Sequence, residues 1–493
     1  MRRHHGISAG MHIEFELKLV SDKAAGMDAL PRALELDAPE TIRMRALYFD
    51  TPDFRLAKSG YSLRIRQTGR RHIQTVKASD IAGIFARREW ERPVRGNRPK
   101  LDADNPIAET LGKHVAELEP RFEVRTRRSM WMIKTDDALI ELVLDHAEAR
   151  AGGETLSFAE IELELKEGDE AAIFTLAQRI GKLAPVRLGV LSKAERAQRL
   201  LQGAKTSDKD RKVFMTPQMT AADAFQAVIH ACLRHYRLNE DRLIAQDNAE
   251  ALHQARIALR RLRSALAAFR PVISGKTART LDADIRWLTG QLAPARNIDA
   301  VTAQLGSIAQ SAKLRAARKA AYADARRALD STLSRELMLD IVKWTSSGKW
   351  AERRKNRKLL GKPAREYAAQ TIGRLHKKLT SQAQAIAGPD DERRHKARKT
   401  AKKLRYTVEF FALLFDKGRE RKARIRYLAV LEELQDHLGT LNDMVMMPVL
   451  MAELGLNMDE MEYESRAIGE RDFHIMQSVH AMNLLCDADH FWE

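Results

Sequence analysis

The stretch that decides the fold of the first half of the chain is HIEFELK, residues 12–18. Charged and apolar residues alternate in it, and a period of two is typical of a β-strand, in which residues i, i+2 and i+4 share one face. Glu14, Glu16 and Lys18 therefore lie together on one face of the expected strand. For a single strand, a solvated charged face at the surface of a sheet explains this pattern.

The alternation continues well beyond this stretch, with turn residues between the segments. We expect strands at residues 12–20, 43–50, 61–68, 72–78, 85–95, 121–135, 138–148 and 156–165, followed by a helix near 169–183 and a basic segment at 192–202. So many consecutive strands predict an antiparallel sheet that curls or closes. We assign residues 11–202 to this β domain.

Charges of both signs share one face on most of these strands, and apolar residues occupy the opposite face. The charged residues that follow this parity are Glu14, Glu16, Lys18, Arg64, Arg66, Lys77, Glu89, Glu91, Arg125, Arg127, Glu141, Asp145, Glu160, Glu162 and Glu164. With that face turned inward, the sheet forms a polar tunnel. Mg²⁺ prefers carboxylate and phosphate oxygens, and arginine presents a planar fork that suits phosphate. The pattern therefore indicates a site for a metal ion and a linear triphosphate.

From about residue 218 the pattern changes to the 3.6-residue period of helices. We expect long helices near residues 220–237, 243–270, 277–293, 297–333, 363–387, 391–415, 420–440 and 443–455, after a polar linker at 203–217. Elements of this length with short connections predict helical bundles, to which we assign residues 218–493.

The helical half contains an internal repeat. HQARIALRRLR from His253 matches HKARKTAKKLR from His395, with every position offset by 142 residues. On a helix, each copy places a histidine and three basic residues in one stripe. The stripe residues are His253, Arg256, Arg260, Arg263, His395, Arg398, Lys402 and Arg405. A charged stripe is usually a solvated face, but two copies with identical spacing favour a selected surface and two related units in tandem.

The formal net charge of +18 is unevenly distributed. Up to residue 205, 35 Lys and Arg stand against 31 Asp and Glu, a net charge of +4, and the remaining 50 against 36 give +14. The helical half should therefore attract a polyanion or an acidic surface.

Composition bounds the cellular setting. The chain has no apolar run near the roughly 20 residues that span a bilayer, and its start has no hydrophobic leader. The two cysteines, Cys232 and Cys486, lie far apart. We expect a reduced, cytoplasmic setting, no membrane partner and no disulfide framework.

Taken in order, the motifs of the first half resemble the CYTH superfamily, the triphosphate tunnel metalloenzymes. Glu14-x-Glu16-x-Lys18 is similar to that family's ExExK signature, and YFDTPDFRLAKSGYSLRIRQ from Tyr48 is similar to its next block. TVK, ARREWE, ELVLD, EIELEL and LSKAER follow in family order, so the resemblance covers residues 11–200. It implies a tunnel of roughly eight antiparallel strands that binds a triphosphate and hydrolyses or cyclises it with Mg²⁺ or Mn²⁺.

The resemblance also implies residue roles. Glu14 and Glu16 would bind the metal or orient metal-bound water, with Asp145, Glu160 and Glu162 completing the metal-binding side. The residues that would hold phosphates are Lys18, Arg64, Arg66, Lys77, Arg125 and Lys193, joined through strand parity by Arg127, for which Arg128 is the alternative. Glu14, Glu16 and Lys18 would form the catalytic set, with Lys18 neutralising charge or, alternatively, serving as an acid or base.

The second half resembles the CHAD domain, a helical domain that often follows CYTH in one chain. The two repeats and QDHLGTLND from Gln435 carry this resemblance. It implies two pseudo-symmetric helical bundles whose basic stripes bind inorganic polyphosphate. A flexible polyanion releases counterions when it meets closely spaced Arg and Lys, by analogy with nucleic acid.

We therefore expect a metal-dependent triphosphatase that splits tripolyphosphate into pyrophosphate and phosphate, recruited by its helical domain to long-chain polyphosphate or polyphosphate granules. Two alternatives stay open. The tunnel can act on an organic triphosphate, such as thiamine triphosphate, a nucleoside triphosphate or ATP cyclised to cyclic AMP. In the second alternative, the protein binds polyphosphate and catalyses no reaction. Nucleic-acid binding is not favoured, because the basic half has no interleaved aromatic residues.

Overall fold

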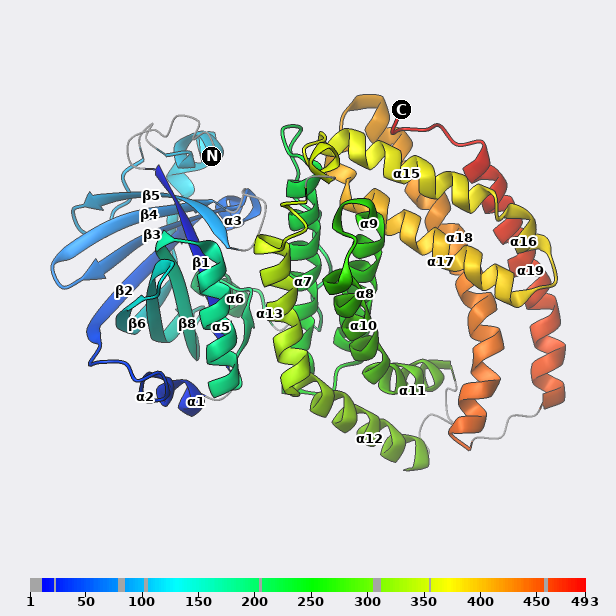
Figure 1. Ribbon diagram of the computed structural model, residues 1–493, viewed down its shortest axis with the longest axis horizontal. Coiled ribbons are helices and arrows are strands. Elements are labelled where there is room, and N and C mark those ends of the chain that lie inside the picture. Colours follow the sequence, from blue (N-terminus) through cyan, green and yellow to red (C-terminus); the bar gives the residue numbers. More distant parts are fainter. Residues whose placement is uncertain are drawn as a thin grey trace. The chain divides into compact units, whose positions relative to one another are not determined.

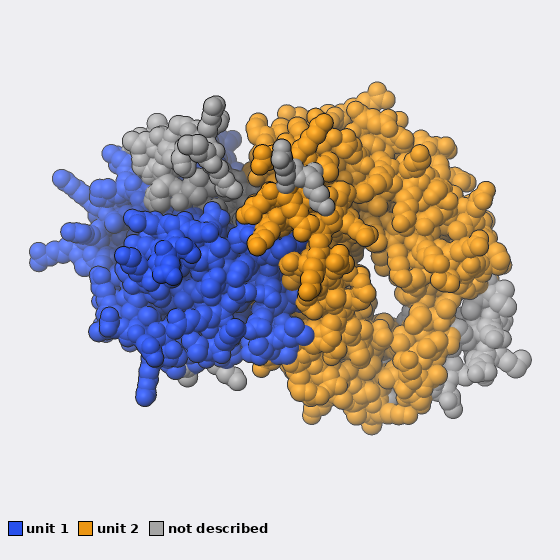
Figure 2. All heavy atoms as spheres, in the orientation of Figure 1, with its two compact units in different colours: residues 1–206, 331–347 blue, residues 207–330, 348–493 orange. Residues whose placement is uncertain are grey.

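The computed structural model describes residues 11–21, 24–78, 85–101, 105–203, 206–304, 312–353, 356–455 and 460–493. The chain forms two compact units, coloured blue and orange in Figure 2. The first comprises residues 1–206 with 331–347, and the second comprises 207–330 with 348–493. None of the described helices is both long enough and apolar enough to cross a membrane.

The first unit is built on a closed antiparallel barrel (Figure 1). Its strands are β1 (Met11–Val20), β2 (Glu40–Asp50), β3 (Tyr61–Thr68), β4 (Arg71–Ala78), β5 (Ala86–Val94), β6 (Glu119–Lys134), β7 (Ala138–Ala151) and β8 (Glu154–Gly168). They pair in the order β5-β4-β3-β2-β6-β7-β8-β1, and pairing of β5 with β1 closes the ring. The expected tunnel is confirmed. A short ninth strand, β9 (Arg187–Gly189), was not expected and adds to β1.

The barrel turns its charged face inward and its apolar face outward. Directly paired residues share a face, and the pairs Tyr48–Arg64 and Arg64–Thr75 point into the tunnel. The alternate residues Leu63 and Ile65 are buried on the outside. The carboxylates of β1 therefore line an interior rather than a solvated surface, while Phe15 packs on a helix outside the barrel.

Short helices cover the outside of the barrel and one end of its interior. The helices of the first unit are α1 (Ala24–Asp28), α2 (Leu30–Ala33), α3 (Arg55–Lys58), α4 (Ile107–Leu111), a 3-10 turn (Gly112–Glu117), α5 (Glu170–Leu183), α6 (Lys193–Leu201) and α13 (Thr332–Ser347). Phe174 of α5 packs edge-on against Phe15. Inside the barrel, Ala197 of α6 packs against Val124.

The second unit is helical throughout. Its elements are α7 (Ala221–Ala245), α8 (Ala249–Ala268), α9 (Arg270–Ile273), α10 (Lys276–Gln291), α11 (Ala293–Gln304), α12 (Ala312–Leu329), α14 (Arg357–Leu360), α15 (Ala364–Thr380), α16 (Ala383–Ala387), α17 (Asp391–Phe410), a 3-10 turn (Ala412–Phe415), α18 (Gly418–Glu453) and α19 (Glu460–Cys486). The repeated stripes lie on α8 and α17. Thr220 and Asp223 form a capping box that starts α7.

Some helix boundaries differ from those expected. The helices expected at 420–440 and 443–455 form one helix, α18, which continues through Pro448. The range 297–333, expected as one helix, contains α11 and α12, with residues 305–311 outside the described part of the chain, and a further helix, α13, begins at Thr332. Helix α13 lies within the range 218–493 that we assigned to the helical domain, but it packs in the first unit.

Candidate functional sites

The barrel interior is a charged cavity of about 310 Å³. Its carboxylates are Glu14, Glu16, Glu89, Glu91, Glu141, Glu162 and Glu164, and its cations are Lys18, Arg64, Arg66, Lys77, Arg128, Lys166 and Lys193. The carboxylates come from β1, β5, β7 and β8, and the cations from β1, β3, β4, β6, β8 and α6. The interior therefore has the combination that a metal-bound triphosphate requires.

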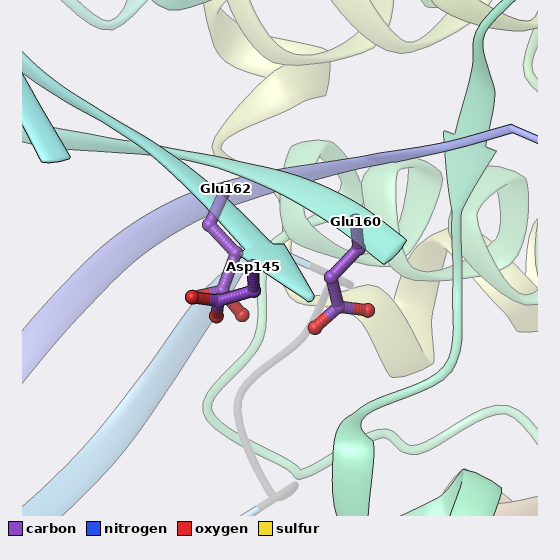
Figure 3. A group of neighbouring side chains, drawn as sticks. All are labelled: Asp145, Glu160 and Glu162. Carbon is purple, nitrogen blue, oxygen red and sulfur yellow. The ribbon is translucent and has the colours of Figure 1, made fainter. Parts of the chain in front are cut away.

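Three carboxylates gather at one end of this interior (Figure 3). Asp145 on β7 pairs in register with Glu160 on β8, and Glu162 follows two residues later on the same face. One oxygen from each lies within 4.8 Å of the other two. We call Asp145, Glu160 and Glu162 the acidic trio.

Two cations hold the acidic trio together. Lys193 Nζ lies 2.8 Å from Asp145, 2.5 Å from Glu160 and 2.8 Å from Glu162. Arg128 donates from Nε and Nη2 to Asp145 at 2.9 and 2.7 Å, and from Nη2 to Glu162 at 2.6 Å. Lys193 reaches this position because Ser192 and Glu195 form a capping box that begins α6 at Lys193.

The electrostatics of the trio suit a hard divalent cation. Burial opposes ionisation of Glu162, but Lys18, Lys193 and Arg128 outweigh it and hold its pKa well below the usual range. Burial also disfavours the charged form of Lys193, yet the trio raises its pKa. Glu160 Oε2 is buried without a hydrogen-bond partner in the part of the chain that the structure describes. Glu162 thus supplies ionised oxygens and Glu160 an oxygen that accepts no hydrogen bond from the described residues, and a divalent cation would compete with Lys193 for the trio.

A second carboxylate group lies around Lys77. Lys77 Nζ donates to Glu14 at 2.9 Å and also contacts Glu89. Burial disfavours ionisation of Glu14, but Lys77 and hydrogen bonds lower its pKa. Burial raises the pKa of Glu89 to about 6, and the hydrogen bond shared with Glu14 adds to this effect. Glu89 was not assigned a role from the sequence, although its parity with Glu91 in RREWE placed it on the tunnel face.

The ExExK segment therefore divides its charges between the two carboxylate groups. Glu14 belongs with Glu89, while Glu16 contacts Lys18, whose Nζ donates to Glu162 at 2.7 Å. Lys18 links Glu16 to the acidic trio. Of the expected metal ligands, the structure brings Asp145, Glu160 and Glu162 together and places Glu14 elsewhere in the tunnel.

Arg64 and Arg66 form the opposite, cationic side. Arg64 is bonded to Tyr48 and has no ion pair among the described residues, and Arg66 Nη2 lies 3.7 Å from Glu91. The positive charge of Arg64, followed by burial, lowers the pKa of Arg66. The charges of Glu89 and Glu91 help to raise the pKa of Arg64 despite its burial, so both guanidinium groups are charged neighbours that can bind an anion.

In the second unit, the two basic stripes meet in one cluster. Burial and the charges of Arg260 and Arg296 lower the pKa of Arg256 to about 10. Burial and the charges of Arg398 and Arg260 lower the pKa of Lys402 to about 7. Because Arg260 from the first copy acts on Lys402 from the second, the stripes are close together.

Four stripe residues are free of ion pairs in the described part of the chain. We call Arg256, Arg260, Arg398 and Lys402 the basic cluster; Arg296 on α11 adds its charge nearby. The other two stripe cations are neutralised instead. Arg263 pairs with Asp282 at 2.9 Å, and Arg405 with Glu432 at 3.3 Å.

The histidines of the stripes flank the basic cluster. His395 Nδ1 lies 2.8 Å from Asn442 Oδ1 on α18. Burial is the main cause that lowers the pKa of both His253 and His395. Both rings therefore favour the neutral form, and His395 links α17 to α18 through Asn442.

Comparison with known families agrees with both sites. Residues 12–197 match the family model of the CYTH domain, and residues 227–452 match that of the CHAD domain. The chain carries a CYTH domain followed by a CHAD domain.

Individual proteins are similar to one or the other part. An inorganic triphosphatase of Haemophilus influenzae is 28% identical over 195 residues, which are 37% of this chain and 53% of that protein. The chain thus spans about half the length of this relative. The CHAD domain of the plant Ricinus communis is 27% identical, with a TM-score of 0.47, over 57% of this chain and 97% of that chain. A putative adenylyl cyclase from Hippeastrum, described as having a dominant triphosphatase activity, is 20% identical, with a TM-score of 0.27, over 38% of this chain and 95% of that one.

The CYTH domain does not bring two of the expected phosphate ligands into its tunnel. Arg125 and Arg127 lie on the outer face of β6, and they line an outer hollow of about 850 Å³ with Arg43 and Arg45. Arg128 stands inside instead, paired in register with Asp145. Helix α6 packs inside the barrel against Val124, so Val124, Thr126 and Arg128 form the inner face of β6 and the parity of Arg125 and Arg127 points outward.

This placement predicts different roles for the arginines inside and outside the tunnel. We expect Arg64→Ala or Arg66→Ala to raise the KM for a triphosphate by tenfold or more, because each charge-assisted hydrogen bond is worth about 1.5–3 kcal/mol. The matched double variant Arg125→Ala, Arg127→Ala should leave KM unchanged. Steady-state kinetics on the wild type and the three variants checks this. An equal rise in KM for the two tunnel variants and for the double variant would contradict the assignment.

Proposed function

We propose that the CYTH domain hydrolyses inorganic triphosphate to pyrophosphate and phosphate with Mg²⁺ or Mn²⁺. The observation that carries this proposal is the separation of charge inside the tunnel, with the acidic trio on one side and Arg64 with Arg66 on the other. A triphosphate bound between them would meet a metal at one end of its phosphate chain and guanidinium groups at the other. The similarity to an inorganic triphosphatase supports the same activity.

Each group in the tunnel has a role in this proposal. Asp145, Glu160 and Glu162 would hold the metal, and Glu16 would act on that side through Lys18. When bound, the metal neutralises phosphate charge and activates water. Arg64 and Arg66 bind and orient the phosphates, so that positioning and electrostatic stabilisation supply most of the catalysis. Glu89, with a pKa of about 6, can accept a proton near neutral pH.

The substrate decides between this proposal and its alternatives. We would measure phosphate release from tripolyphosphate, thiamine triphosphate, ATP and long-chain polyphosphate, with Mg²⁺ or Mn²⁺ and with EDTA. A strong preference for tripolyphosphate that EDTA abolishes is the expected result. Preference for an organic triphosphate would reassign the substrate. Binding without turnover of any substrate would leave a polyphosphate-binding protein.

We also propose that the CHAD domain binds long-chain inorganic polyphosphate through the basic cluster. Its cations come from α8 and α17, which the repeat relates, and repulsion among them would be relieved by a polyanion. Figure 2 shows an opening through the second unit in this view. Such binding would recruit the enzyme to polyphosphate, including granules in the cytoplasm.

The low pKa of Lys402 makes this binding dependent on pH. Its pKa of about 7 leaves the amine mainly neutral at pH 8, and a bound polyanion favours the charged form. We expect polyphosphate binding at pH 8 to take up close to one proton and to weaken between pH 7 and 9. Calorimetry in buffers of different ionisation enthalpy measures this uptake. Lys402→Gln should abolish it, and uptake that survives this change would show that another group titrates.

A further inference from the structure

Helix α13 belongs to the CHAD part of the sequence but to the tunnel part of the structure. It lies within the residues 227–452 that match the CHAD family, yet it groups with the barrel and packs on α5 and β9. Of the helices in the first unit, it is the one contributed by the second half of the sequence. The tunnel unit therefore depends on a segment from far along the chain.

Polar and apolar contacts both fix α13 in place. Gln178 Nε2 on α5 donates to Asp340 Oδ1 at 2.6 Å, and Lys343 Nζ donates to Gln178 Oε1 at 2.9 Å. Leu339 is 2% exposed, and its Cδ1 lies 3.7 Å from the place that a Cβ on Gly181 would occupy. Leu339 thus packs against α5 at Gly181.

Strand β9, on which α13 packs, is adjacent to two tunnel cations, Lys18 on the neighbouring strand β1 and Lys193 further along the chain. Leu188 and Gly189 of β9 pair with Leu19 and Lys18 of β1. The approach is close, because a Cβ on Gly189 would lie 2.9 Å from Lys18 Cβ. Four residues after Gly189 the chain reaches Lys193. The position of β9 therefore affects both ammonium groups.

Those two ammonium groups converge on one carboxylate. Lys18 Nζ and Lys193 Nζ donate to Glu162 at 2.7 and 2.8 Å. A displacement of β9 would move both relative to the acidic trio and to a bound triphosphate. Small displacements of charged groups in a site can cost a large factor in rate.

We propose that α13 is a positioning element of the triphosphate site, which holds β9 against β1 and thereby places Lys18 and Lys193. The proposal rests on the triphosphatase function proposed above. It makes the CYTH and CHAD parts interdependent through chain connectivity, because α13 follows α12 of the helical unit directly. It also assigns a catalytic consequence to residues that touch no substrate.

The test uses the full chain with Leu339→Ala, and with Asp340→Ala as a variant that opens no apolar cavity. Each should raise KM for tripolyphosphate by roughly tenfold at a temperature well below unfolding, with kcat reduced less. Leu339→Met should restore the wild-type value. The matched control is Ile107→Ala, which shortens a fully buried side chain of the same unit in the core beneath α3 and α4.

The control separates positioning from stability. Equal changes in KM for Leu339→Ala and Ile107→Ala, or an unchanged KM in both α13 variants, would overturn the proposal. If the wild-type chain binds tripolyphosphate without turnover, the function proposal fails, but Kd from calorimetry replaces KM and α13 is still tested. If the wild-type chain neither binds nor hydrolyses tripolyphosphate, both proposals fail.

Discussion

Glu162→Gln is expected to reduce tripolyphosphate turnover on the order of a hundredfold or more, because a bound metal supplies several kcal/mol of stabilisation. Glu162 accepts hydrogen bonds from Lys18, Arg128 and Lys193. The amide keeps the shape of the side chain but removes the charge that these cations and a metal share. Metal affinity should therefore fall together with turnover.

Two measurements check this result. Phosphate release across a Mn²⁺ titration gives turnover, and the Mn²⁺ signal in electron paramagnetic resonance gives binding independently of activity. The control is Glu148→Gln on β7, which removes a carboxylate that faces the outer hollow and contacts Arg150 at 2.6 Å. Full turnover by Glu162→Gln, or equal losses in both variants, would contradict a metal site at the acidic trio.

The second large effect is expected in the CHAD domain. Neutralising the basic cluster with Arg256→Gln, Arg260→Gln, Arg398→Gln and Lys402→Gln should abolish measurable binding of long-chain polyphosphate near physiological salt. It should also reduce the slope of log affinity against log salt by about three to four, since each lost contact removes close to one released counterion. Fluorescence anisotropy of labelled polyphosphate over a salt series measures both.

The same variant is expected to unfold at a higher temperature. The lowered pKa values of Arg256 and Lys402 show that the fold disfavours their charged forms. Between pH 7 and 10 the unfolded chain protonates Lys402 while the folded chain does not, so stability from this group rises with pH in wild type. The double variant Arg263→Gln, Arg405→Gln should instead destabilise slightly, because Asp282 and Glu432 lose partners. If the variant with four substitutions binds weakly because it is unfolded, its unfolding temperature should instead lie below that of the wild type.

Much of the CYTH fold was readable from local pattern. The period of two in residues 12–18 and in later segments predicted eight strands, and shared parity grouped the charges of each strand on one face. The helical repeat likewise predicted that His253 and His395 occupy equivalent places. These features depend on near neighbours in the chain, where side-chain direction follows from the backbone period alone.

Other features required the pairing of distant segments. Parity groups Arg125 with Arg127 but cannot say which face of β6 is inside, and only packing of α6 against Val124 and the register with Asp145 select Arg128. The raised pKa of Glu89 comes first from its burial in the closed barrel and then from Glu14 on another strand. The meeting of the two basic stripes needs α8 and α17 side by side.

The sequence by itself thus determined most of the strands and helices, the grouping of charges on each of them, and the two families. Only the tertiary structure decided which charges meet, because ion pairing depends on strand register and helix packing over separations that local periodicity does not encode. Helix α13 shows this most clearly. Its residues follow the period of the helical half, and yet the apolar contact of Leu339 and the bond between Asp340 and Gln178 place it on the tunnel unit.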